Sequence, residues 1–157
     1  MKEIERLKEI VIKLRSENGC AWDKVQTHES LKPECIEEAA EVINGINILS
    51  ETGDPDNLKE ELGDLLLQVM FHSVIAEEEG LFNFEDVCKV ISEKMIRRHP
   101  HVFNNVVYEN YEEQHRAWEE IKKKEKEGKK WDDEFLKKAF KESKELIEVA
   151  SKRKGFI

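Results

Sequence analysis

Two acidic motifs carry the side chains of this sequence that are most suited to chemistry: Glu37-Glu38-Ala39-Ala40-Glu41 and Glu61-Leu62-Gly63-Asp64. Each motif contains two carboxylates at positions i and i+3, which share one face of a helix. Four such carboxylates repel one another when they meet in a small volume, unless a cation compensates their charge. The residue types and their spacing therefore indicate a site for a divalent cation.

The ligand types narrow the choice of metal to Mg²⁺, with Mn²⁺ as a possible substitute. Glu38, Glu41, Glu61 and Asp64 offer only hard oxygen donors, whereas Zn²⁺ usually recruits His or Cys. Neither motif has the Glu-x-x-His pattern of helical di-iron proteins. Mg²⁺ keeps several waters and commonly binds substrate phosphates, so phosphate chemistry becomes a candidate function. From the residues alone, two solvated acidic helix faces remain the alternative.

A helical hairpin is the element expected to position these carboxylates. Apolar residues recur at helical spacing over residues 33–50 and again from Asp54-Pro55 to about Glu79, and the stretch 51–57 between them is typical of a turn. In an antiparallel hairpin the two acidic pairs fall within about one helical turn of each other. We expect Gly63 to let the facing helix approach closely.

The remaining sequence is also helical in pattern, and no segment alternates as a strand would. Charged residues make up 39% of the 157 residues, while Gly (7) and Pro (3) are scarce, as is typical of helical proteins. We predict an all-α fold with a four-helix bundle at its centre and a loop over residues 20–32. The further helices are expected over residues 2–17, 84–98, 108–126 and 132–152.

Composition excludes several classes of function and location. The net charge of -9 argues against general nucleic-acid binding, which needs a basic face. No apolar run reaches the length of about eighteen residues that a membrane span requires, and the first residues lack the apolar region of a signal peptide. Cys20, Cys35 and Cys88 share no metal-binding or redox spacing, so we expect reduced thiols in a cytoplasmic protein without membrane partners.

The flanks of the acidic motifs carry a family resemblance. Over about residues 4–126 the sequence resembles the MazG family of all-α nucleotide pyrophosphohydrolases. Besides the acidic motifs, the matching segments are Gly19-Cys20-Ala21-Trp22-Asp23, Gln26-Thr27-His28-Glu29-Ser30-Leu31, Arg97-Arg98-His99-Pro100-His101-Val102-Phe103 and Trp118-Glu119-Glu120-Ile121-Lys122.

The resemblance implies hydrolysis of a nucleoside triphosphate to the monophosphate and pyrophosphate, by attack of water at the α-phosphate. It implies Mg²⁺ held by Glu38, Glu41, Glu61 and Asp64, with Glu37 orienting or deprotonating water as a further catalytic residue. It also implies a homodimer whose chains together complete the four-helix bundle. We accordingly divide the chain into a MazG-like domain over residues 1–126 and a helical C-terminal extension over residues 127–157.

Cations for the phosphates are expected on two later helices. Lys94 and Arg98 are four residues apart, as are Trp118 and Lys122, and the resemblance places substrate-contacting residues at these positions. Lys and Arg bind phosphates, and Trp can stack on a base. With Arg97 these residues form the predicted substrate-binding set. A favourable charge at a helix C-terminus for the basic residues, and a packing role for Trp118, are the alternatives.

Two other functions remain open at this level. One is a narrower activity in the same superfamily, such as a dUTP/dCTP pyrophosphatase or a phosphoribosyl-ATP pyrophosphohydrolase. The other is a helical interaction protein without enzymatic activity, whose acidic faces are only solvated.

Overall fold

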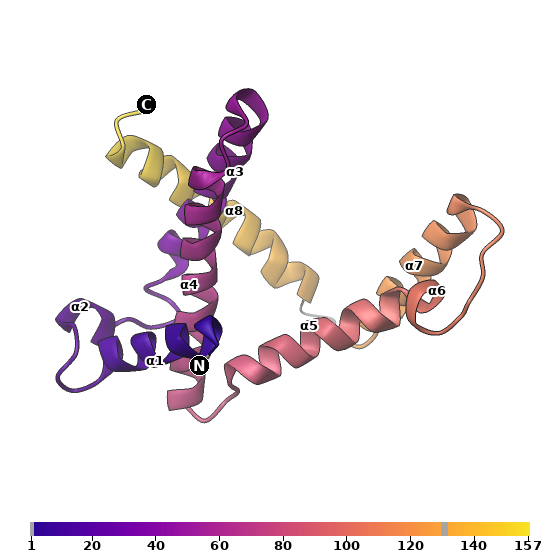
Figure 1. Cartoon of the computed structure of the whole chain (residues 1–157), viewed down its shortest axis with the longest axis horizontal. Coiled ribbons are helices and arrows are strands. Elements are labelled where there is room, and N and C mark those ends of the chain that lie inside the picture. Colours follow the sequence, from indigo (N-terminus) through magenta and orange to yellow (C-terminus); the bar gives the residue numbers. More distant parts are fainter. Residues whose placement is uncertain (1, 130–131) are drawn as a thin grey trace. The chain divides into compact units, whose positions relative to one another are not determined.

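The computed structural model describes residues 2–129 and 132–157, and these residues form helices and no strand (Figure 1). This confirms the predicted all-α class. The helices are α1 (Glu3–Arg15), α2 (Ala21–Lys24), α3 (Lys32–Thr52), α4 (Asp56–Glu78), α5 (Phe84–Arg98), α6 (Pro100–Phe103), α7 (Tyr111–Lys126) and α8 (Asp132–Arg153). They group into two separately packed units, one with the residues up to Phe84 and Phe140–Ile157, the other with Glu85–Ala139.

The predicted hairpin is the centre of the first unit, where α3 and α4 lie side by side (Figure 1). Pro33 occupies the first turn of α3, and Gly53 ends that helix in a left-handed conformation with φ of 77°, which glycine adopts without steric cost. The turn then closes on Asp54, whose Oδ1 accepts a hydrogen bond from the backbone N–H of Asp56 at 2.9 Å. The sequence pattern Asp54-Pro55 thus marks the start of α4, as expected.

The buried core of this unit lies between α1, the segment before α3, and the C-terminal half of α4. Its fully buried members are Val11, Leu31, Met70, Phe71, Val74 and Ile75. Elsewhere on the hairpin, several large apolar side chains of α3 and α4 remain exposed. These exposed residues are Ile43, Ile46, Leu62, Leu66 and Val69. The completion of a four-helix bundle by a second chain stays a prediction.

Close approach of the two hairpin helices depends on a glycine other than the expected one. A Cβ added to Gly63 would meet no atom within 4 Å, so the expected role of Gly63 in this contact is wrong for the single chain. Gly45 is buried instead, and a Cβ added there would come within 2.7 Å of the Cα of Leu58. The crossing point of α3 and α4 is therefore closer to the turn than Gly63.

The second unit contains α5, α6 and α7. Between α5 and α7, where the sequence analysis placed no helix, the structure forms the single turn of α6 over Pro100–Phe103 before a positive φ at Asn105. Asn110 then caps α7, its side-chain oxygen accepting from the backbone N–H of Glu113 at 2.9 Å. The division into a domain over residues 1–126 and an extension over 127–157 stays a prediction.

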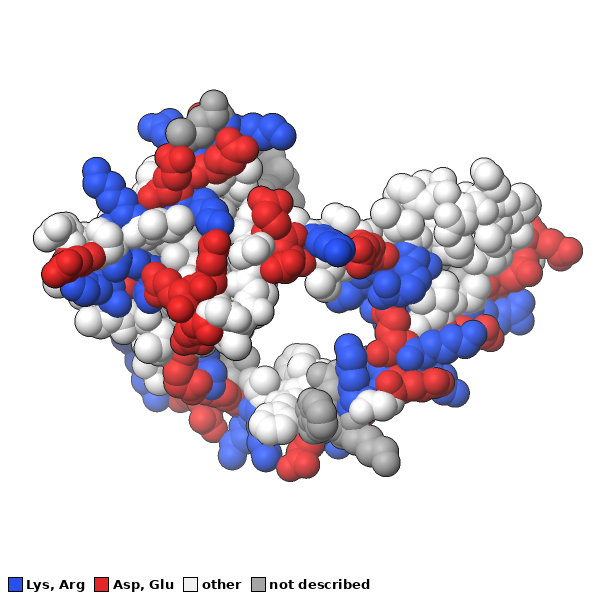
Figure 2. Space-filling model, turned by 90° about the horizontal axis from the view of Figure 1, so that it is seen from below, with Lys and Arg blue, Asp and Glu red and all other residues white. Residues whose placement is uncertain are grey.

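Three further observations bear on function. On the face drawn in Figure 2, Lys and Arg side chains are interspersed with Asp and Glu. None of the helices in the described ranges combines the length and apolar character needed to cross a bilayer. Cys20, Cys35 and Cys88 are free cysteines, as expected.

Candidate metal centre

Three of the predicted carboxylates converge between α3 and α4. Glu38 of α3 and Glu61 and Asp64 of α4 each offer one oxygen, and these three oxygens lie within 4.8 Å of one another. Oxygens around an octahedral Mg²⁺ are about 3 Å apart when adjacent and about 4.2 Å apart when opposite, given Mg–O distances of about 2.1 Å. Small side-chain movements would therefore bring all three oxygens onto one ion.

Asn57 orients one of these carboxylates. Its Nδ2 donates to Oε1 of Glu61 at 2.9 Å, one helical turn along α4. The Oδ1 of Asn57 is buried without a hydrogen-bond partner among the described residues. Residues that hold a metal ligand in place commonly lie in this second layer. The sequence analysis missed Asn57, although its i, i+4 spacing from Glu61 is a signal that could have identified it.

Glu38 is the most electrostatically strained member of the cluster. Its partial burial, followed by the nearby charges of Asp64 and Glu41, raises the pKa of Glu38 from 4.5 to about 7. Its Oε2 is buried and has no hydrogen-bond partner in the described part of the chain. An unpartnered acceptor among like charges is the environment that a hard cation relieves. The residues present therefore fit a divalent cation bound by oxygen.

The other two predicted carboxylates face a different partner. Glu37 and Glu41 both form ion pairs with Lys154, which follows α8, and Glu37 also pairs with Arg153. Burial alone would raise the pKa of Glu37, but the hydrogen bonds from Lys154 and Arg153 outweigh it and lower that pKa. The structure thus does not bring Glu41 into the cluster of three, and its role as a metal ligand stays a prediction.

A cavity of about 470 Å³ adjoins these side chains. Glu37, Glu41 and Glu61 line it from the hairpin, and Lys154 and Phe156 line it from the C-terminal segment. The sequence analysis did not foresee that C-terminal residues take part in the site. More than 110 residues separate Lys154 from Glu41, and no local spacing pattern links residues so far apart.

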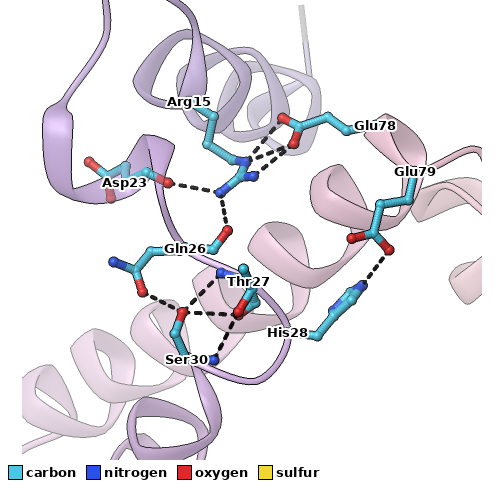
Figure 3. A network of polar contacts seen from close by, with 8 residues as sticks. All are labelled: Arg15, Asp23, Gln26, Thr27, His28, Ser30, Glu78 and Glu79. Atoms are coloured by element: carbon cyan, nitrogen blue, oxygen red, sulfur yellow. Dashed lines mark hydrogen bonds and ion pairs between the residues drawn. The ribbon is translucent and has the colours of Figure 1, made fainter.

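The segment that enters α3 is held by a polar network (Figure 3). The guanidinium of Arg15 donates to the carbonyl oxygens of Asp23 at 2.8 Å and Gln26 at 3.0 Å, and it pairs with Glu78 at 2.7 Å. Gln26 in turn accepts from the hydroxyl of Ser30 at 2.7 Å. This network ties the segment with the sequence Gln26-Thr27-His28 to the C-terminal end of α4.

Two histidines make a second link between this segment and α4. The rings of His28 and His72 are parallel, with their planes 1° apart, and their Nδ1 atoms meet at 2.7 Å. The other nitrogen of His72, Nε2, lies 3.2 Å from the Sγ of Cys35 on α3. Burial, followed by the charge of His28, lowers the pKa of His72. Sequence reasoning missed this contact because the two histidines are 44 positions apart.

The predicted substrate-binding residues all lie in the second unit. Lys94, Arg97 and Arg98 line one cavity of about 530 Å³ together with Glu125. Glu125 pairs with both arginines at 2.6 Å, and the hydrogen bond from Arg98 is the main cause of its lowered pKa. The structure therefore gathers the three predicted cations on one face of α5.

Trp118 and Lys122 also meet as their spacing predicts. The Nζ of Lys122 lies 4.0 Å from the centroid of the Trp118 ring, within the range of a cation–π interaction. Trp118 and Arg98 line a further cavity of about 220 Å³ with His101, Tyr108 and Gln114. The assignment of these residues to substrate binding stays a prediction.

Comparison with known proteins identifies a domain that contains these carboxylates. A sequence model of the MazG nucleotide pyrophosphohydrolase domain matches residues 26–103, the stretch that contains the carboxylates Glu38, Glu61 and Asp64. The chain is 54% identical, over 80% of its length, to a protein of Thermotoga maritima named nucleoside triphosphate pyrophosphohydrolase/pyrophosphatase MazG.

Two further relatives extend the comparison. The chain is 47% identical, over 80% of its length, to the nucleoside triphosphate pyrophosphohydrolase of Escherichia coli K12, and 49% identical, over 79%, to the uncharacterized protein YabN of Bacillus subtilis. The matched regions cover only 46%, 47% and 24% of the Thermotoga, Escherichia and Bacillus relatives, so the chain spans less than half of each. With the domain match and these identities, the chain belongs to the MazG family.

Proposed function

We propose that this protein is a Mg²⁺-dependent nucleoside triphosphate pyrophosphohydrolase, which releases the nucleoside monophosphate and pyrophosphate by attack of water at the α-phosphate. The observation that carries the proposal is the convergence of Glu38, Glu61 and Asp64, with a buried and unpartnered oxygen on Glu38. Two relatives whose names state this activity share 54% and 47% identity with the chain.

Each acidic residue has a proposed part in the reaction. Glu38, Glu41, Glu61 and Asp64 hold the cation, and Asn57 keeps Glu61 in place through its hydrogen bond. When bound, Mg²⁺ neutralises phosphate oxygens and makes a bound water more acidic. Glu37, on the same helix and next to Glu38, orients the attacking water or accepts its proton.

The basic residues of α5 and α7 would serve the nucleotide. Lys94, Arg97 and Arg98 bind the phosphates, and their positive charges compensate the negative charge that develops on the leaving pyrophosphate. Trp118 offers a ring for stacking on the base, and Lys122 beside it supplies a further positive charge. Positioning and charge neutralisation, rather than a covalent intermediate, account for the catalysis.

The decisive experiment is an analysis of products in water labelled with ¹⁸O. Each common nucleoside triphosphate is incubated with the protein and Mg²⁺, and monophosphate, diphosphate, phosphate and pyrophosphate are resolved by mass spectrometry. We expect monophosphate and pyrophosphate in equal amounts, with the label in the monophosphate, because water adds to the α-phosphorus. Asp64→Asn should abolish turnover with unchanged circular dichroism, while Glu60→Gln, on the same helix, should retain it.

Other products would reject the proposal in distinct ways. Label in the pyrophosphate would place the attack at the β-phosphorus, and diphosphate with phosphate would place the cleavage at the other bond. Turnover confined to dUTP and dCTP, or to phosphoribosyl-ATP in a parallel assay, would favour one of the narrower activities. Turnover of none of these substrates with Mg²⁺ or Mn²⁺ would favour an interaction protein.

We propose in addition that the protein acts as a homodimer through the exposed apolar residues of the α3–α4 hairpin. Ile43 is 60% exposed and Leu62 50% exposed in the single chain, and a second chain that covers them would remove this apolar surface from water. Light scattering should then give twice the chain mass of 18.5 kDa. Ile43→Lys should reduce it to the monomer mass, whereas Val107→Lys, at an exposed residue outside the hairpin, should not. A wild-type monomer would reject the dimer.

A further inference from the structure

The C-terminal segment contacts Glu37 and Glu41, the two predicted carboxylates of α3 that lie outside the cluster of Glu38, Glu61 and Asp64. Arg153, the last residue of α8, pairs with Glu37, and Lys154 pairs with both Glu37 and Glu41, at 2.9 Å from the Oε1 of Glu37. Phe156 reaches the same cavity beside Glu61. Two positive charges thus lie against acidic residues that the sequence assigned to metal binding and catalysis.

Charge pairs link this segment to α3 at both ends, and between them the partly buried Ile147 and Ala150 line the cavity. At the other end of the contact, Lys32 of α3 pairs with Glu142 of α8 at 3.1 Å. No Cα of α8 approaches α3 or α4 within 8 Å among the described residues. Phe156 remains 74% exposed. Ion pairs between partly exposed side chains are weak and are screened by salt, so the segment can detach without disturbing the core of the unit.

The contact has a direct consequence for the predicted ligands. Glu41 cannot direct the same oxygen at Lys154 and at a metal ion, and in the structure that oxygen faces Lys154. Glu38, Glu61 and Asp64 form the cluster without it. A divalent cation that takes this oxygen of Glu41 must therefore displace the Lys154 ammonium, and one that takes the other oxygen of Glu41 is repelled by that ammonium at short range.

We propose that Arg153 and Lys154 form an electrostatic cap that competes with the divalent cation for the carboxylates of α3, and that binding of the cation releases the C-terminal segment. The cap rests on the proposed function, since it regulates the same metal centre. It is an autoinhibitory contact: it neutralises Glu37 and Glu41 while no cation is present, and it lines the adjoining cavity. Its release opens that cavity to an anionic substrate at the moment when the cation has arrived.

Mn²⁺ binding to the full chain tests the competition without any substrate. Free Mn²⁺ is measured by electron paramagnetic resonance for the wild type and for Arg153→Gln/Lys154→Gln. We expect the double variant to bind Mn²⁺ about threefold or more tightly than the wild type, as loss of a weak competing ion-pair network predicts. The matched control is Lys141→Gln/Lys152→Gln, which removes the same charge from residues that pair within α8, with Glu145 and Glu148.

The outcomes separate the cap from the metal centre. Tighter binding in the double variant but not in the control supports the cap. Equal affinity in all three proteins, or an equal gain in both variants, overturns the cap and leaves the metal centre intact. Absence of Mn²⁺ binding in all three proteins overturns the cap together with the metal centre.

Release of the segment has its own readout. Trypsin cleaves after Lys154, and intact mass spectrometry follows the loss of residues 155–157. We expect millimolar Mg²⁺ to accelerate this cleavage beyond the effect of NaCl at the same ionic strength, because salt alone also weakens the ion pairs. Cleavage that Mg²⁺ leaves unchanged, or slows, relative to NaCl would overturn the cap.

Discussion

Gly45 of α3 lies against the backbone of Leu58 on α4, so closely that a Cβ on Gly45 would come within 2.7 Å of the Leu58 Cα. The contact is between backbones, so it cannot be relieved by rotating a side chain. We therefore expect Gly45→Ala to destabilise the protein by about 1–3 kcal/mol, as overpacking does elsewhere. Urea unfolding measures this change directly.

Gly63→Ala is the matched control for this prediction. A Cβ on Gly63 meets nothing within 4 Å in the single chain, and alanine is favoured over glycine in a helix by up to about 1 kcal/mol. The free energy of unfolding should therefore stay unchanged or rise. Equal effects of the two substitutions would show that the α3–α4 contact does not depend on Gly45.

Binding of a divalent cation should stabilise the folded protein. Only the folded chain brings Glu38, Glu61 and Asp64 together, so a cation at a hundred times its dissociation constant should add about 2.7 kcal/mol. We expect Mg²⁺ and Mn²⁺ to raise the midpoint of thermal unfolding, and Glu61→Gln and Asp64→Asn to remove most of that rise. Glu60→Gln, at an exposed neighbour on α4, should keep it. A rise that survives both ligand substitutions would place the cation elsewhere.

The pKa of Glu38 predicts how stability depends on pH without metal. Burial and the charges of Asp64 and Glu41 raise the pKa of Glu38 from 4.5 to about 7 in the folded state. Between these values the folded protein binds more protons than the unfolded chain. The stabilisation is therefore complete below about pH 4.5 and is lost as the pH rises through about 7. Urea unfolding in EDTA should show this loss for the wild type, and Glu38→Gln should remove it.

The lowered pKa of His72 predicts the opposite dependence of stability on pH. Burial and His28 lower the pKa of His72 below 6.5, so here the unfolded chain binds more protons. The stabilisation is present above pH 6.5 and is lost as the pH falls toward the lowered pKa. The hydrogen bond between the Nδ1 atoms of His28 and His72, 2.7 Å apart, also needs one ring to donate and the other to accept, so protonation of the accepting nitrogen would disrupt it.

The opposing contributions of Glu38 and His72 to the pH dependence of stability can be separated by variants in the same unfolding series. Glu38→Gln leaves only the contribution of His72, so the free energy of unfolding should then rise with pH between about 5 and 7. His72→Gln leaves the Glu38 term, so stability should fall over the same range. His115→Gln, at an exposed histidine of the second unit, should match the wild type. Parallel curves for all four proteins would mean that neither residue has the shifted pKa described above.

Helical periodicity accounts for what could be predicted from the sequence. The convergence of Glu38 with Glu61 and Asp64 follows from i, i+3 spacing on two helices joined by a short turn, and both the spacing and the turn are local features of the sequence. The close approach of these helices was assigned to Gly63 because it lies between two acidic residues, but spacing alone does not reveal where two helices cross. Only the packed structure shows that Gly45 lies at the crossing.

Long-range polar contacts could not be predicted in this way. The pairs of Lys154 with Glu41 and of His28 with His72 join residues far apart in the chain, and each residue type is common on exposed surfaces. The Arg15 contacts are harder still, because two of their acceptors are backbone carbonyls, which every residue carries. The sequence contains no signal that identifies which backbone carbonyl will accept a hydrogen bond from a side chain.

Arg15 should be required for the order of the segment before α3. Its side chain is only 7% exposed, and its guanidinium donates to the carbonyls of Asp23 and Gln26 while pairing with Glu78. Lysine keeps the charge but cannot reach three acceptors with one planar group. Because hydrogen bonds involving a charged group contribute about 1.5–3 kcal/mol each, we expect Arg15→Lys to cost about 2 kcal/mol or more in urea unfolding.

Hydrogen exchange locates that loss in the structure. In Arg15→Lys the amides of residues 20–31 should exchange faster, while those in the turn between α3 and α4 should keep their wild-type rates, because the Arg15 contacts do not reach that end of the hairpin. Arg6→Lys is the control, since Arg6 is exposed and pairs with Glu3 on the same helix, and it should change neither rate nor stability. If exchange over residues 20–31 is unaltered in Arg15→Lys, other contacts, such as that of His28 with His72, hold the segment.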